Sequence, residues 1–282
     1  MSKDKKIYCH YTWHEDITTK ARAPEDNCSL ENVATYYQHD SSDKFDLHVV
    51  DEDGSLVVSK LNRNAAIRVL SNGERRVLRR IMKNACAVKP DVKRGKKNGG
   101  VSDRYVCFGF RKDPKLSGVI GEYAFKSSVD SIMAETLKDH VSTYVSKLEG
   151  GARRLITSHP DFHWFQELRE TLDLPSVSCT RDGIATQFSI GVNYWSGAHV
   201  DTDYFFTFLS CLAEDGKDPD DIMYYFCFPE YKIAIPLRSG DVIVFNPLKY
   251  HCCSNCRYEK SFIFSAYVSR KTVHTAIVNK QG

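Results

Sequence analysis

Long apolar runs are missing from these 282 residues, and no segment approaches the roughly 20 apolar residues that a membrane-spanning helix needs. The opening stretch, MSKDKKIYCHYTWHED, has basic side chains but no apolar run behind them, so we expect no secretory signal. The sequence contains one C-x-x-C pair, Cys253 and Cys256. A structural zinc site usually takes its four ligands from two such pairs, and the second pair is missing. We therefore expect an intracellular protein, nuclear or cytoplasmic, with no membrane association.

Ten cysteines are spread along the chain from Cys9 to Cys256. The chain is too long for the small secreted class that needs disulfides in place of a core, so we expect reduced, buried or half-buried thiols. Hydrophobic residues make up 42% of the composition and charged residues 27%, which is typical of a globular protein. The simplest partition is a single decorated domain over residues 1–282.

The net charge is only +3, but its distribution is uneven. Residues 71–126 contain 15 Lys and Arg against five Asp and Glu, whereas the rest of the chain contains 24 against 31. The runs RRVLRR (75–80) and KRGKK (93–97) are suited to neutralising the phosphates of DNA or RNA, and the second also resembles a nuclear address. The alternative is a solvated helix face followed by a flexible basic loop.

Residues 1–150 predict a mixed, partly helical N-terminal extension. Asp53-Gly54 favours a hairpin turn between two apolar runs. Apolar residues at helical spacing predict helices over 74–88, from a cap at Ser127 or Ser128 to Gly150-Gly151, and, just beyond the extension, over 161–172.

From residue 184 the pattern changes to short segments that are rich in β-branched and aromatic residues. Turn signals at Pro229-Glu230 and Ser239-Gly240-Asp241 separate them. Repeated short strands at this spacing favour a jelly-roll, so we expect an α+β fold. Its double-stranded β-helix core would span 184–270, with the N-terminal helices packed against one sheet.

His199 and Asp201 stand two residues apart at the end of a predicted strand, so their side chains point to the same side. His251 follows a later strand, DVIVFNP, whose return path brings it back to the first. Two histidines and one carboxylate form the facial triad of non-haem Fe(II) oxygenases. Asp203 is the competing carboxylate, because it shares the face of Asp201.

Two motifs flank these residues: Y-x-x-G over 194–197 and G-D-x-x-x-F-x-P-x-x-x-H over 240–251. With them, residues 184–268 resemble the Fe(II)/2-oxoglutarate-dependent dioxygenase superfamily, in particular its prolyl-hydroxylase-like and AlkB-like branches, which include enzymes similar to the ten-eleven-translocation proteins. The resemblance implies an enzyme that binds Fe(II) through His199, Asp201 and His251 and uses 2-oxoglutarate as its cosubstrate.

The resemblance also implies positions for the cosubstrate. Lys260 stands where the family places the basic residue that pairs with the distal carboxylate of 2-oxoglutarate, and Arg257 or Arg270 are alternatives for that role. Tyr194 occupies the position whose hydroxyl often hydrogen-bonds the same molecule.

Three functions remain open at this stage. The basic segment and the aromatic residues near the site favour oxidation of a nucleic-acid base such as 5-methylcytosine, flipped out of its stack. The prolyl-hydroxylase-like motifs favour a protein substrate whose side chain is hydroxylated. A jelly-roll that binds metal without turnover is the third alternative.

Overall fold

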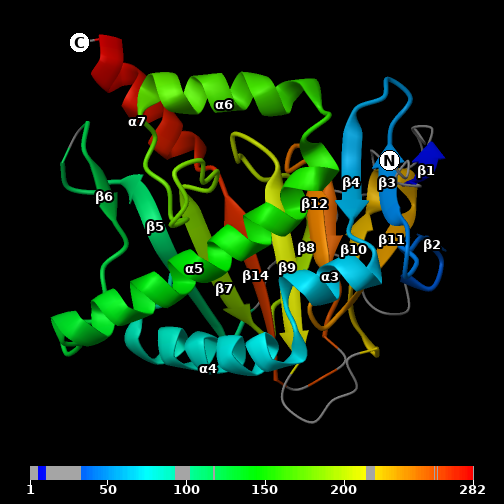
Figure 1. The fold of residues 1–282 in the computed structure, drawn as a ribbon, viewed down its shortest axis with the longest axis horizontal. Coiled ribbons are helices and arrows are strands. Elements are labelled where there is room, and N and C mark those ends of the chain that lie inside the picture. The colour runs from blue at the N-terminus through cyan, green and yellow to red at the C-terminus, as the bar shows by residue number, and fades with distance from the viewer. Residues whose placement is uncertain are drawn as a thin grey trace.

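The computed structural model describes residues 6–10, 33–92, 102–116, 118–213, 220–256, 258 and 260–281 (Figure 1). These residues form the predicted α+β fold, in which two β-sheets face each other and helices cover the outer side of the longer one. The helices are α3 (Arg63–Val69), α4 (Asn72–Val88), α5 (Ser131–Ile156), α6 (Pro160–Leu172) and α7 (Arg270–Gln281), with a 3₁₀ turn at Pro229–Tyr231. The strands are β1 (Lys6–His10), β2 (Tyr37–Gln38), β3 (Asp46–Val50), β4 (Leu56–Lys60), β5 (Arg104–Lys112), β6 (Ile120–Glu122), β7 (Gln187–Val192), β8 (Ser196–His199), β9 (Thr207–Ala213), β10 (Ile222–Phe228), β11 (Ile233–Arg238), β12 (Val242–Phe245), β13 (His251–Cys253) and β14 (Ser261–Tyr267).

The strands from β7 to β14 form the double-stranded β-helix that the sequence predicted. In the described part of the chain, the longer sheet has the order β1-β3-β4-β12-β9-β14-β7-β5-β6, and the shorter sheet has the order β2-β11-β10-β13-β8. β7, β9, β12 and β14 therefore face β8, β10, β11 and β13, with antiparallel neighbours inside each group. Aromatic and β-branched side chains fill the space between the sheets, as expected for strands buried on both faces.

The N-terminal region extends the same long sheet. The predicted hairpin joins β3 to β4 through Gly54, whose φ of 82° suits a residue without a Cβ. β4 then pairs with β12, and β5 pairs with β7 on the other side of the core. The sequence did not predict β5, which lies beside the core strands and contributes to the site described below. The KRGKK run falls outside the described residues.

The helix predicted over 74–88 is confirmed as α4. Ser71 accepts a hydrogen bond from the backbone of Glu74, and the Glu74 carboxylate accepts one from the backbone of Ser71, which makes a complete capping box. Leu78, Met82 and Ala85 pack against the core, whereas Arg76 and Arg80 are exposed and Arg75 is buried. α6 likewise matches its prediction within one residue.

The longest helix, α5, departs from its prediction at both ends. It begins after Asp130, whose side chain accepts a hydrogen bond from the Met133 backbone, rather than after Ser127 or Ser128. It also runs through Gly150-Gly151 to Ile156. A Cβ at Gly151 would lie 2.2 Å from Cγ2 of Val69, so this glycine allows α3 to pack closely on α5 instead of ending the helix.

Among the described cysteines, seven have free thiols, most of them buried as expected. Cys252 is an exception, because it is disulfide-bonded. The expectation of reduced thiols throughout is therefore corrected at this position. Among the described helices, none is both long and apolar enough to cross a membrane.

Candidate metal centre

The two predicted histidine ligands lie side by side in the shorter sheet. His199 ends β8, His251 begins β13, and the two residues are register partners in the antiparallel pair. Their ring centroids are 4.6 Å apart. Asp201 follows in the next loop, where its backbone N–H donates to the carbonyl of Pro247 at 2.9 Å. This bond ties the carboxylate-bearing loop to the segment that leads into His251.

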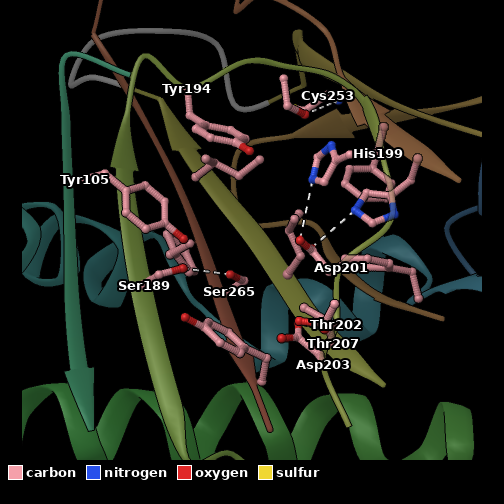
Figure 2. A pocket seen from close by; sticks show the side chains of 18 residues that line it. Tyr105, Ser189, Tyr194, His199, Asp201, Thr202, Asp203, Thr207, Cys253 and Ser265 are labelled. Atoms are coloured by element: carbon pink, nitrogen blue, oxygen red, sulfur yellow. Dashed lines mark hydrogen bonds and ion pairs between the residues drawn. The ribbon is translucent and has the colours of Figure 1, made fainter. Parts of the chain in front are cut away.

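The three side chains converge on one point (Figure 2). The carboxylate of Asp201 places Oδ1 3.6 Å from Nε2 of His199 and Oδ2 3.4 Å from Nε2 of His251. One ligand atom from each residue lies within 4.8 Å of the others. Both imidazoles are buried, whereas the Asp201 side chain is 29% exposed, which opens the site to solvent on one side.

The backbone fixes the orientation of both imidazoles. Nδ1 of His199 lies 2.8 Å from the carbonyl of Gly197, and Nδ1 of His251 lies 2.8 Å from the carbonyl of Lys249. A carbonyl accepts only, so each Nδ1 carries the proton and each Nε2 is left with a lone pair. Hydrogen bonds of this kind orient histidine ligands in metal sites. The donor set therefore fits a divalent transition metal such as Fe(II).

Two neighbouring side chains do not join this group. Asp203 accepts a hydrogen bond from Oγ1 of Thr207 at 3.0 Å and forms a β-bridge with Ser269. Cys253 shares the strand of His251, but burial raises the pKa of its thiol well above the ordinary value, so it stays protonated. In the part of the chain that the structure describes, His199, Asp201 and His251 are the one group of three with metal-binding geometry.

The other sequence-predicted positions have different locations. Tyr194 lines the cavity beside the triad. Lys260 is exposed and lies in a separate surface pocket with Lys83 and Arg104, at the far end of β14. Arg270 is exposed at the start of α7 and does not line the cavity. Arg257 falls outside the described residues. The structure therefore brings Tyr194 to the triad but not Lys260 or Arg270.

The cavity has a volume of about 200 Å³ and two chemically different walls. Phe226 stacks on the ring of His251 at 5.4 Å, and Phe245 meets the same ring edge-on at 4.8 Å. These rings shield the imidazole from water.

The opposite wall comes from β5, β7 and β14 and carries hydroxyl groups that the sequence reasoning missed (Figure 2). Two of them are adjacent, because Ser189 and Ser265 are register partners whose Oγ atoms lie 2.8 Å apart. Burial raises the pKa of Tyr267 well above its ordinary value, so this phenol remains protonated. The signal in the sequence was polar residues at alternate positions of otherwise apolar strands.

No family model matches the chain, and no curated protein matches its sequence. Solved structures do resemble its fold. A structure of NgTET1 in complex with 5mC DNA aligns with a TM-score of 0.49 and 10% identity, over 95% of this chain and 99% of that one. A 2OG-Fe(II) oxygenase family oxidoreductase from Burkholderia pseudomallei aligns with a TM-score of 0.36 and 17% identity, over 72% of this chain and 83% of that one. A Pseudomonas putida prolyl-4-hydroxylase aligns with a TM-score of 0.36 and 12% identity, over 76% of this chain and 93% of that one.

Identities and scores this low describe a shared fold and carry no argument about chemistry. The chemical argument rests on the chain's own residues. Its two facing sheets and the convergence of His199, Asp201 and His251 give two imidazoles and one carboxylate at a single point, the donor set that a non-haem Fe(II) site uses.

Proposed function

We propose that this chain, with the fold and triad of an Fe(II)- and 2-oxoglutarate-dependent dioxygenase, oxidises a C–H bond of a nucleic-acid base such as 5-methylcytosine. The observation that carries the enzymatic part is the convergence of His199, Asp201 and His251 within 4.8 Å at a cavity. Iron with 2-oxoglutarate and dioxygen supplies the oxidation, in which the cosubstrate leaves as succinate and carbon dioxide while the substrate gains a hydroxyl group.

The protein's own part is positioning and the exclusion of water. His199 and His251 hold their Nε2 atoms toward one point because their Nδ1 protons are engaged by the backbone. His199, Asp201 and His251 would hold the metal at the wall of the cavity, from which substrate could reach it. Phe226 and Phe245 pack against the ring of His251 and shield this ligand from bulk water.

Exposed aromatic and apolar side chains on α6 and in the segments that follow His199 and Pro247 support a flat substrate. Trp164 on α6 is 50% exposed and stacks on Tyr204, with ring centroids 5.9 Å apart and an angle of 17° between the planes. Val200 and Leu248, neighbours in sequence of His199 and Pro247, are also exposed. A base that leaves its stack gains stacking on such surfaces. Among such bases we propose 5-methylcytosine, the example that the sequence analysis already considered.

The described part of the basic segment has a defined place relative to the triad. Arg76, Arg79, Arg80 and Lys83 line a shallow pocket on α4. α4 lies near the ends of β5, β7 and β14 that carry Arg104, Val192 and Lys260 (Figure 1), and the four basic side chains of its pocket do not line the triad cavity. The α4 arginines would therefore contact phosphates at a distance from the oxidised base.

Two measurements test this function. The logarithm of the affinity for single- and double-stranded DNA should fall linearly with the logarithm of the salt concentration, because phosphate binding releases counterions. Succinate release should rise with a 5-methylcytosine oligonucleotide and vanish in His199→Ala. Binding that is indifferent to salt would contradict the nucleic-acid substrate. Turnover with peptides but not with oligonucleotides would assign the chain to protein hydroxylation, and no turnover with either would favour a binding module.

A further inference from the structure

The loop between β12 and β13, residues 246–250, contacts two of the three proposed metal ligands, and we refer to it as the ligand loop. The carbonyl of Pro247 accepts a hydrogen bond from the backbone N–H of Asp201 at 2.9 Å. The carbonyl of Lys249 lies 2.8 Å from Nδ1 of His251 and accepts its proton. The position of the ligand loop therefore sets both the place of Asp201 and the rotation of the His251 ring.

The ligand loop is itself held by two other parts of the chain. Its first backbone N–H, on Asn246, donates to the carbonyl of Val57 on β4 at 3.0 Å. The ammonium group of Lys249 forms an ion pair with the carboxylate of Asp51, which directly follows β3. The same side chain hydrogen-bonds the hydroxyl of Tyr231 in the 3₁₀ turn. The hairpin of β3 and β4 and the 3₁₀ turn therefore meet on the Lys249 side chain.

The carboxylate of Asp51 is fixed before it meets the lysine. Its Oδ1 accepts a hydrogen bond from the backbone N–H of Ser55 at 2.8 Å, and its own N–H donates to the Ser55 carbonyl at 3.0 Å. Oδ2 is the oxygen that contacts Lys249. The side chains of the pair are only 10% and 23% exposed, for Asp51 and Lys249 respectively. Such a pair is less screened by salt than an exposed one, and it orders one long side chain instead of two.

Asp51 and Lys249 do not line the cavity beside the triad. Their side chains are therefore not placed to touch a metal ion or a substrate held there. The link from Asp51 to the metal centre runs through the ligand loop, whose two carbonyl groups contact Asp201 and His251.

We propose that Asp51 is a positioning residue of the metal centre, because its ion pair with Lys249 holds the ligand loop in place. The held loop keeps the Lys249 carbonyl on Nδ1 of His251 and the Pro247 carbonyl on the backbone of Asp201. The proposal rests on the proposed function, since it concerns the centre at which that chemistry would occur. Without the ion pair the loop gains freedom, so metal binding must order both ligands and becomes weaker.

The test is a titration of the full chain with Mn(II), followed by calorimetry and by electron paramagnetic resonance of the bound ion. Asp51→Asn keeps an oxygen for the Ser55 N–H but removes the charge, and Lys249→Met removes the ammonium group but keeps a long side chain. Each should weaken Mn(II) binding by about tenfold, at the lower end of the loss caused by outer-shell substitutions, and alter the resonance spectrum.

Two further variants distinguish positioning from a general loss of stability. The double variant Asp51→Asn/Lys249→Met should bind Mn(II) no more weakly than either single variant, because the two groups act through one contact. Lys249→Arg, which can still pair with Asp51, should bind within about twofold of the unaltered chain and keep its spectrum. Circular dichroism at the titration temperature identifies the folded variants, and if Asp51→Asn does not fold, the comparison of Lys249→Met with Lys249→Arg decides.

A matched control is Arg153→Met on α5. Arg153 pairs with Asp182 at 2.5 Å and its side chain is 22% exposed, close to the value for Lys249, but neither residue lines the cavity or belongs to the ligand loop. Loss of this pair should leave the Mn(II) affinity and the resonance spectrum unchanged.

Three results would overturn the positioning role: unaltered affinity and spectrum in both Asp51→Asn and Lys249→Met, losses that add in the double variant, or an equal loss in Arg153→Met. In all three, the unaltered chain binds Mn(II). Failure of the unaltered chain itself to bind Mn(II) would instead overturn the metal centre on which the proposed function depends, so the two failures are distinguishable.

Discussion

His199 and His251 are register partners across β8 and β13, and each donates its Nδ1 proton to the backbone carbonyl two residues before it. Strand pairing therefore sets the spacing of the two imidazoles, and local backbone geometry sets their rotation. The metal-binding Nε2 atoms are arranged before any ion arrives, which reduces the ordering that binding requires.

The first prediction concerns metal affinity. His199→Ala or His251→Ala should weaken Mn(II) or Fe(II) binding by on the order of 100-fold or more, because loss of an outer-shell partner alone already costs about 10- to 100-fold. The measurement is metal titration by calorimetry or electron paramagnetic resonance. His163→Ala, an exposed histidine on α6, is the matched control and should bind metal normally. Undiminished binding after both ligand substitutions would contradict the site.

A buried ionic network joins β4 to β12 and supplies the second prediction. Nζ of Lys60 lies 2.7 Å from Oδ2 of Asp241, and Arg63 contacts the other oxygen at 2.8 Å. Burial of Asp241 opposes its ionisation, but Lys60 and Arg63 outweigh burial and hold the pKa of Asp241 below its ordinary value of 3.8. Asp241→Asn should cost about 1–3 kcal/mol at neutral pH, because Lys60 and Arg63 lose a buried charged partner while Asp40 still pairs with Lys60.

The pH dependence of that loss follows from the direction of the pKa shift. A carboxyl with a lowered folded pKa stabilises the fold above its unfolded pKa and loses the effect as pH falls through the folded value. The difference between the unaltered chain and Asp241→Asn should therefore shrink below about pH 4. Denaturant unfolding at a series of pH values measures it, and a difference that grows on acidification would contradict the assignment.

A third prediction concerns Glu149, whose pKa is shifted in the opposite direction to that of Asp241. Its carboxylate accepts hydrogen bonds from the backbone N–H groups of Ile184 and Ala185, which position the chain just before β7. Burial raises the pKa of Glu149 above its ordinary value of 4.5, even though these two bonds act against the rise. Glu149→Ala should cost about 1–3 kcal/mol, because two buried donors lose their acceptor.

Glu149→Gln separates the charge from the hydrogen bonding. The stabilising effect of a carboxyl with a raised folded pKa is present below its unfolded pKa and is lost as pH rises through the folded value. Glu149→Gln should therefore gain stability relative to the unaltered chain as pH rises from about 4.5 toward neutrality, in thermal unfolding followed by circular dichroism. A relative loss over that interval would show that the carboxyl ionises without cost.

The sequence predicted the triad from one local spacing and one distant motif. The i, i+2 rule places His199 and Asp201 on one side, and the returning strand supplies His251. The sequence could not predict on which face of β14 Lys260 lies. A shift of one residue in the register of β14 would exchange the two faces, and the pairing with β7 fixes that register. The function of Gly151 could not be predicted either, because glycine is suited both to ending a helix and to close packing between helices. The position of Val69 in the structure distinguishes the two.

A fourth prediction uses the separation between α4 and the triad. Arg76→Glu/Arg80→Glu should lower affinity for duplex DNA and reduce the slope of log affinity against log salt by about 1 for each phosphate that is no longer neutralised. Turnover of a short oligonucleotide should stay within about twofold, because these α4 side chains do not line the cavity. Lys44→Glu/Lys280→Glu makes the same charge change on exposed residues outside the basic segment and serves as control. Equal losses of affinity in both variants would remove the special role of α4.

The most direct test of the metal centre is an anaerobic titration of the full chain with Fe(II) and then 2-oxoglutarate, followed by visible absorption. The arrangement of His199, Asp201 and His251 predicts a metal-to-ligand charge-transfer band that saturates at about one iron per chain and is absent from His199→Ala and His251→Ala. A band of equal intensity in those variants, or iron that binds without any band, would contradict a cosubstrate chelated at this triad.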